Sequence, residues 1–149
     1  MPHVAAEDVA NYFIWRANAD EEFGDNITNL KLQKLVYYAQ GFHLAWHGAP
    51  LFPEPIEAWA HGPVVRPLYF KYQKFGANAI PTPEGFDPAS IDEKTQGLLE
   101  EVYQVYGQYS AWGLRNLTHE EAPWKDTPRN EAIPIEAMRR YFADSLTLG

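Results

Sequence analysis

Hydrophobic positions between Leu30 and Trp46 recur at helical spacing and predict one long helix with little solvent-facing surface. Thr28 before this run, and Gly48 with Pro50 after it, are typical of the two ends of a helix and place it at about 29–47. At 100° per residue one stripe contains Leu32, Leu35, Val36, Ala39, Phe42, His43 and Trp46, while Leu30, Tyr37, Leu44 and Ala45 cover the opposite side. A helix that is apolar nearly all round is expected inside the protein.

Three polar residues run along this helix between its apolar faces. Gln33, Gln40 and His47 are spaced by seven positions and therefore lie almost in register along the helix axis. Because buried amides need hydrogen-bond partners, we expect this polar seam to bind backbone groups around the helix. The alternative is that the seam forms the floor of a recognition groove.

The remaining pattern predicts shorter elements on both sides of the central helix. Residues Ala6 to Asn18 read as an amphipathic helix, and residues 51–65 read as a short ribbon of two or three strands that includes Ile56 to Ala60. Further helices are expected over Arg66–Phe75, after a capping box at Ser90–Glu93, after Ser110, and after Pro134 with Ile135, Met138, Phe142 and Leu146 on one face. The acidic run Asp20–Glu22 reads as an exposed connection. The predicted fold is mainly α with a minor β ribbon, a compact helical bundle in one domain over residues 1–149.

Composition narrows the possible functions. Twelve Lys and Arg against twenty Asp and Glu give a net charge of −8, which disfavours direct binding to nucleic acid. The absence of cysteine excludes thiol catalysis, iron–sulfur ligation and thiolate zinc sites. The N-terminus has no basic and apolar leader, and no long uncharged apolar run occurs, so we expect a cytoplasmic protein without a membrane segment.

Four histidines raise the possibility of an enzyme. His43 and His47 stand four apart on the central helix and could share a metal ion, with His61, His119 or a carboxylate completing the set of ligands. No His-Glu-x-x-His pattern supplies the general base of a zinc hydrolase, and no Gly-x-Ser-x-Gly pattern supplies a nucleophile. A metal- or His-dependent hydrolase therefore stands only as an alternative reading.

Two short motifs combine aromatic, basic and turn-forming residues. Trp59, His61 and Arg66 flank a Gly62–Pro63 corner, and such residues are frequent at protein interfaces. The second motif, Thr118 to Lys125, holds His119, two glutamates and Trp124, a composition that suits either proton transfer or a rigid corner plugged by tryptophan. The motif around Gly62–Pro63 has a structural alternative, in which it is a rigid turn that docks a strand onto the central helix.

Four motifs in this order are similar to those of the Panacea antitoxin domain family, a SocA-like group formerly described as a phage-associated, GepA-like domain. They are Leu30–Gly41 (LKLQKLVYYAQG), Pro50–Phe52 (PLF), Ala58–Val64 (AWAHGPV) and Thr118–Trp124 (THEEAPW), within a similarity that spans about Val9 to Phe142.

This resemblance implies a bacterial or prophage-encoded antitoxin that neutralises a cognate protein toxin, encoded nearby, by direct protein–protein contact, without catalysis or a cofactor. Some members of the family instead pass the toxin to an ATP-dependent protease, so a proteolytic adaptor is the second reading. From the residues themselves we expect the partner surface to include five side chains: Tyr37, Trp59, His61, Arg66 and Trp124.

Overall fold

The computed structural model describes residues 4–20 and 27–148, and within them it shows a mainly α fold with a minor β ribbon, as predicted. The α-helices are α1 (Ala6–Ala19), α2 (Asn29–His47), α3 (Arg66–Tyr72), α4 (Glu93–Tyr106), α5 (Ala111–His119), α6 (Ala122–Lys125) and α7 (Ile135–Leu148). Strands β1 (Glu57–Trp59) and β2 (Gly62–Val64) form the ribbon, and two 3-10 turns are η1 (Gln73–Phe75) and η2 (Pro88–Ser90). No helix among the described residues is long and apolar enough to cross a membrane.

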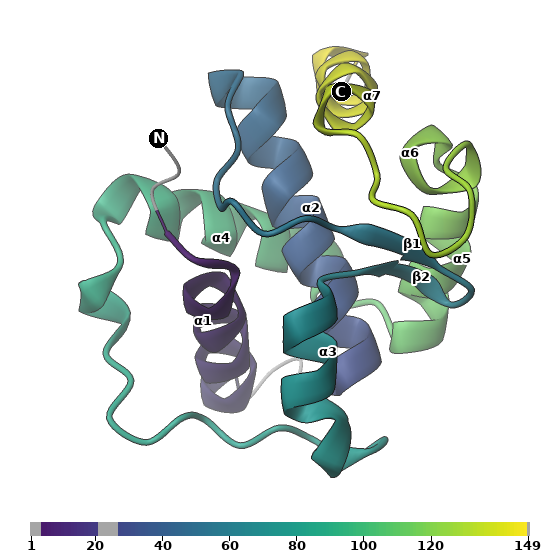
Figure 1. Ribbon diagram of the computed structural model, residues 1–149. Helices are drawn as coiled ribbons and strands as arrows, with labels where there is room; N and C mark the ends of the chain where they lie inside the picture. The colour runs from purple at the N-terminus through teal and green to yellow at the C-terminus, as the bar shows by residue number, and fades with distance from the viewer. Residues whose placement is uncertain (1–3, 21–26, 149) are drawn as a thin grey trace.

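Helix α2 runs through the middle of the molecule, with the other helices placed around it (Figure 1). Its ends match the prediction, because the Thr28 hydroxyl accepts a hydrogen bond from the Lys31 backbone and Gly48 adopts φ 71°. From Asn29 to Leu44 every residue except Leu30 is buried. The prediction that the apolar faces are buried is wrong for two residues. Leu30 is 40% exposed and Trp46 is 49% exposed, because the ends of α2 extend beyond the core.

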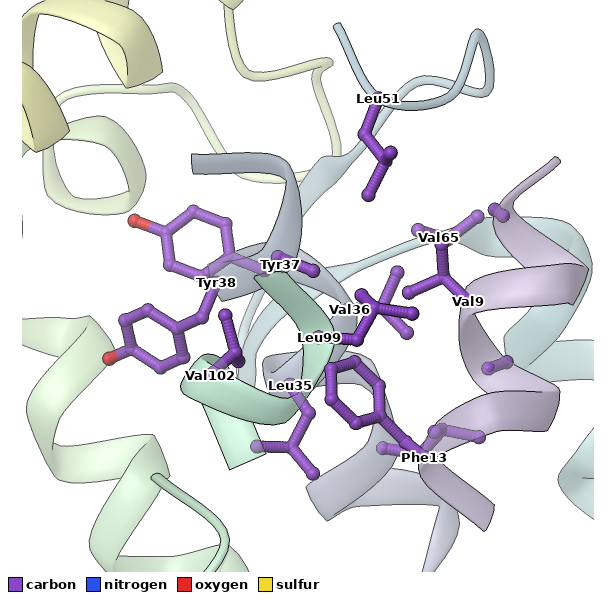
Figure 2. Close-up of a cluster of buried hydrophobic side chains, with 14 of the residues drawn as sticks. Val9, Phe13, Leu35, Val36, Tyr37, Tyr38, Leu51, Val65, Leu99 and Val102 are labelled. Carbon is purple, nitrogen blue, oxygen red and sulfur yellow. The ribbon is translucent and has the colours of Figure 1, made fainter. Parts of the chain in front are cut away.

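The core lies where α1, α4 and α7 contact α2. Figure 2 shows Val9 and Phe13 of α1 close to Val36 of α2 and Leu99 of α4. Helix α7 comes near to α2 at Gly41, where a Cβ atom would overlap the ring of Phe142. A glycine at this position therefore sets how closely the two helices approach.

The ribbon is an antiparallel hairpin that a third segment extends without forming a further strand. Glu57 pairs with Val64, and Trp59 pairs with Gly62. On the other side of β1, the Ala58 backbone exchanges hydrogen bonds with residues 130 and 131, and Ile133 N donates to Ile56 O at 2.7 Å. This edge is thus tied to the segment before α7.

The two glutamines of the predicted polar seam bind backbone groups of the segment that follows α2. Gln40 accepts from Leu51 N at 2.7 Å and donates to Phe52 O at 2.9 Å, and Gln33 accepts from Val65 N at 2.9 Å. His47 does not join them, because it is exposed in the last turn of α2. The seam consequently ends before the helix does.

Three local expectations need correction or fall outside the described residues. Helix α4 begins at Glu93 with Asp92 as its cap, because the Asp92 carboxylate accepts from Thr95 N while the Ser90 hydroxyl donates to Asp87 O. In α7, Met138 and Phe142 are buried, but Ile135 is 40% exposed because the first turn extends beyond the core. Residues 21 and 22 of the acidic connection lie outside the described ranges.

Candidate functional site

The β-hairpin places Trp59 at the end of β1 and His61 in the turn that follows, and both rings contact Tyr69 of α3. Gly62 follows with φ 127°, and a Cβ atom there would lie 3.1 Å from Lys34 Cε and 3.3 Å from Thr118 Oγ1. Glycine is therefore required both for the backbone conformation and for the close approach of the hairpin to α2 and α5.

The aromatic side chains of the hairpin pack on those of α3. The ring of Trp59 contacts the rings of Tyr69 and Phe70 at centroid distances of 4.9 Å and 6.1 Å, and His61 stacks on Tyr69 at 5.7 Å. The guanidinium of exposed Arg66 lies 5.7 Å from the Phe70 ring, which is itself 50% exposed. This arrangement presents aromatic surface and a cation together, as protein interfaces often do.

Trp124 connects this cluster to the short helix α6. Its Nε1 donates to the carbonyl oxygen of Trp59 at 2.7 Å. The imidazole of His119 stacks on its ring at 3.8 Å, and the guanidinium of Arg129 also lies 3.8 Å from the ring centre, so Trp124 lies between the two. The two sequence motifs that were singled out are therefore parts of one surface.

Tyr37 does not belong to that surface. It is fully buried in α2, and its hydroxyl donates to Glu121 Oε1 at 3.0 Å, while Tyr38 donates to Glu121 Oε2 at 2.9 Å. Burial raises the pKa of Glu121 to about 7, although the two phenol hydrogen bonds act in the opposite direction. The expectation that Tyr37 is a surface residue is wrong, because its ring packs on Phe142 of α7 and its hydroxyl bonds Glu121.

The four histidines do not converge on one site. His43 and His47 contact each other at a ring distance of 4.6 Å and line a cleft near the start of α4, whereas His61 and His119 lie by the hairpin. Residues 4–20 and 27–148 contain no group of three His, Asp or Glu side chains placed to hold a metal ion. The arrangement that the hydrolase reading required is not formed.

Several side chains of the site were not anticipated from the sequence. Lys34 is fully buried in α2 beneath Gly62, and Arg129 reaches Trp124 from the loop after α6. Phe70 adds the most exposed ring of the cluster. Of these residues, sequence could have indicated Lys34, because it lies on a helix that was predicted to be buried and lysine is rarely buried without a specific reason.

Comparison with known proteins finds matches that cover this region. A family model described as the antitoxin SocA-like Panacea domain matches residues 32–125, from α2 to α6. Antitoxin SocA of Caulobacter vibrioides (strain NA1000 / CB15N) is 43% identical over 75 residues, which are 50% of this chain and 37% of that protein. This chain therefore aligns with well under half of the length of that relative. No solved structure matches the chain.

Proposed function

Because this chain belongs to the SocA-like Panacea antitoxin domain family, we propose that it acts in the cytoplasm and neutralises a cognate protein toxin by direct binding. The observation that supports direct binding is a continuous surface of aromatic and cationic side chains. We call it the hairpin surface, and it consists of Trp59, His61, Arg66, Phe70 and Trp124. Residues of these types supply much of the binding energy at protein interfaces.

The hairpin surface is held in place before any partner binds. Trp59 donates from Nε1 to Glu57, and its carbonyl oxygen accepts from Trp124. Side chains that are already ordered lose less conformational entropy on association, so this surface is better suited to bind a partner than a set of mobile exposed rings would be. The net charge of −8 also favours encounter with a basic partner.

Growth rescue tests this function. The open reading frame adjacent to the gene is expressed from an inducible promoter with and without this chain, and the two proteins are then co-purified. Relief of toxicity with a stable complex supports sequestration. Relief with disappearance of the toxin overturns sequestration in favour of delivery to an ATP-dependent protease, and absence of any toxicity overturns the antitoxin assignment for that gene pair.

Paired substitutions test the surface within the same assay. Arg66→Ala with Phe70→Ala removes two exposed side chains and is expected to weaken toxin binding at least tenfold while leaving the thermal midpoint nearly unchanged. Trp46→Ala is the matched control, because Trp46 is 49% exposed at the far end of α2. An equal loss of toxin binding in the control and the double variant would show that the hairpin surface is not the toxin-binding surface.

A further inference from the structure

A cleft of about 420 Å³ opens between the start of α2, the start of α5 and the end of α3. We call it the α2–α5 cleft. Its lining includes Thr28, Leu30, His61, Tyr69, Gln73 and Ala111, and none of the described residues that line it is acidic.

Exposed apolar side chains border the α2–α5 cleft. Trp112 follows the lining residue Ala111 and is 67% exposed, the largest exposure among the large hydrophobic side chains in the described ranges. Leu30 and Tyr109 are each 40% exposed. Of these three side chains, Leu30 belongs to the cleft lining itself.

Basic groups surround His61 on the protein side of the cleft. Burial, then the charges of Lys34 and Arg115, lowers the pKa of His61, and burial followed by the charges of Arg115 and Lys34 lowers the pKa of His119. Burial followed by the charge of Arg115 lowers the pKa of Lys34 to about 8. Among the described residues no carboxylate forms an ion pair with any of these four side chains. In a chain with twenty acidic residues, the two cations of this group, Lys34 and Arg115, form no ion pair within the described ranges.

The same group contains buried nitrogen atoms without partners. Nδ1 of His61 and Nε2 of His119 are the two buried side-chain polar atoms in residues 4–20 and 27–148 that form no hydrogen bond. The ammonium of Lys34 donates to Leu30 O at 3.1 Å and has a second and third proton to donate. Buried polar atoms of native proteins are nearly always paired, so a group from outside the chain is the natural partner.

We propose that the α2–α5 cleft is a carboxylate-binding site, in which His61 of the lining supplies a hydrogen bond, the nearby Lys34 and Arg115 supply positive charge, and Trp112, next to the lining residue Ala111, packs on the apolar part of the ligand. His61 is half-buried and lines the cleft, whereas Lys34 and Arg115 are not among the lining residues and act through their charge. The natural ligand is an acidic side chain next to an apolar one in a segment of a protein partner. The assignment of a protein partner as the source of the carboxylate rests on the proposed function, whereas the binding of a carboxylate in the cleft does not.

The charge of the site favours a carboxylate over a phosphate. Lys34, whose pKa is lowered to about 8, and Arg115 are its cations at neutral pH, while burial lowers the pKa of both imidazoles. The net charge of −8 opposes polyanions at long range. A single carboxylate with an apolar body matches both the charge and the lining.

The test uses the full chain alone, so it reports on the cleft whether or not a toxin is bound. Two probes of nearly equal shape, 3-phenylpropionate and its uncharged amide 3-phenylpropanamide, are titrated at constant ionic strength and pH 7. Nitrogen-15 NMR follows the indole of Trp112 and the imidazole of His61. We expect saturable shifts with the carboxylate and at least tenfold weaker binding of the amide. Equal binding of both probes, no saturable shift, or tighter binding of inorganic phosphate would overturn the proposal.

Variants separate the site from general charge effects. Lys34→Met keeps the length and apolar stem of the side chain and should raise the dissociation constant of 3-phenylpropionate at least fivefold, with no change for the amide. Arg115→Gln removes the second, half-buried cation and gives the same expectation if Lys34→Met does not fold. Lys94→Met, exposed on α4, is the matched control and should bind as the unmodified chain does. An equal effect in the control would count against the site.

Discussion

The indole Nε1 of Trp124 donates a hydrogen bond to the carbonyl oxygen of Trp59 at 2.7 Å. This bond joins two motifs that lie 65 positions apart in the chain and holds α6 against the hairpin. The partner-binding candidates Trp59 and Trp124 are therefore also structural residues, and a loss of binding on their removal has to be separated from a loss of stability.

Replacing Trp124 by phenylalanine keeps a ring between His119 and Arg129 but removes the donor. We expect a loss of about 1 to 2 kcal/mol in the free energy of unfolding, because the Trp59 carbonyl oxygen is left without this partner. Urea unfolding measures the change. Trp46→Phe, at an exposed position, should change the stability by less than about 0.5 kcal/mol, and a similar loss in both variants would argue against the role of the bond.

Glu121 makes the stability of the protein depend on pH. Its folded pKa is raised from 4.5 to about 7 by burial, so the fold favours the protonated carboxyl. The resulting stabilisation is fully present below pH 4.5 and is lost as the pH rises through about 7.

Comparison with Glu121→Gln isolates this contribution. The variant keeps a neutral acceptor for Tyr37 and Tyr38 and should not lose stability over this pH range through residue 121. We expect the unmodified chain to lose roughly 3 kcal/mol relative to the variant between pH 4.5 and pH 8. Urea unfolding at four pH values tests this, and parallel pH profiles would contradict it.

Two helical glycines should respond to the same substitution with opposite signs. A methyl group at Gly41 overlaps the ring of Phe142, so Gly41→Ala should destabilise by roughly 1 to 3 kcal/mol as α7 is pushed from α2. At Gly97 in α4 a Cβ atom meets nothing within 4 Å, and Gly97→Ala should stabilise by roughly 0.5 to 1 kcal/mol. Thermal melting of both variants tests the pair, and a Gly41→Ala variant as stable as the unmodified chain would show that the α2–α7 contact is not close.

Gln40 holds the segment after α2 through two backbone hydrogen bonds. Gln40→Leu leaves Leu51 N and Phe52 O buried without these partners and should cost roughly 2 to 4 kcal/mol. Gln104→Leu is the control, because Gln104 is exposed and bonds only the Glu100 side chain. Unfolding free energies that fall equally in both variants would contradict the assignment.

Sequence patterns predicted the elements whose ends depend on neighbouring residues. Thr28 and Gly48 bound α2, and Ser110 caps α5, because each capping bond spans only three or four positions. The predicted capping box at residues 90–93 is wrong, because Asp92, two positions after Ser90, is the N-cap of α4 instead. The family also followed from local motifs, which the match over residues 32–125 confirms.

Only the tertiary structure decided which of the singled-out side chains lie together. Tyr37 is buried because Phe142 of α7 packs on its ring and Glu121, 84 positions away, accepts from its hydroxyl. The four histidines separate into two pairs at different places. The grouping of Lys34 with His61 and Arg115 likewise joins α2, the hairpin and α5. Helix caps and apolar periodicity involve residues within a turn or two of each other, so sequence alone determines them. The site depends on how buried surfaces of distant segments fit together, and that packing is a property of the whole fold.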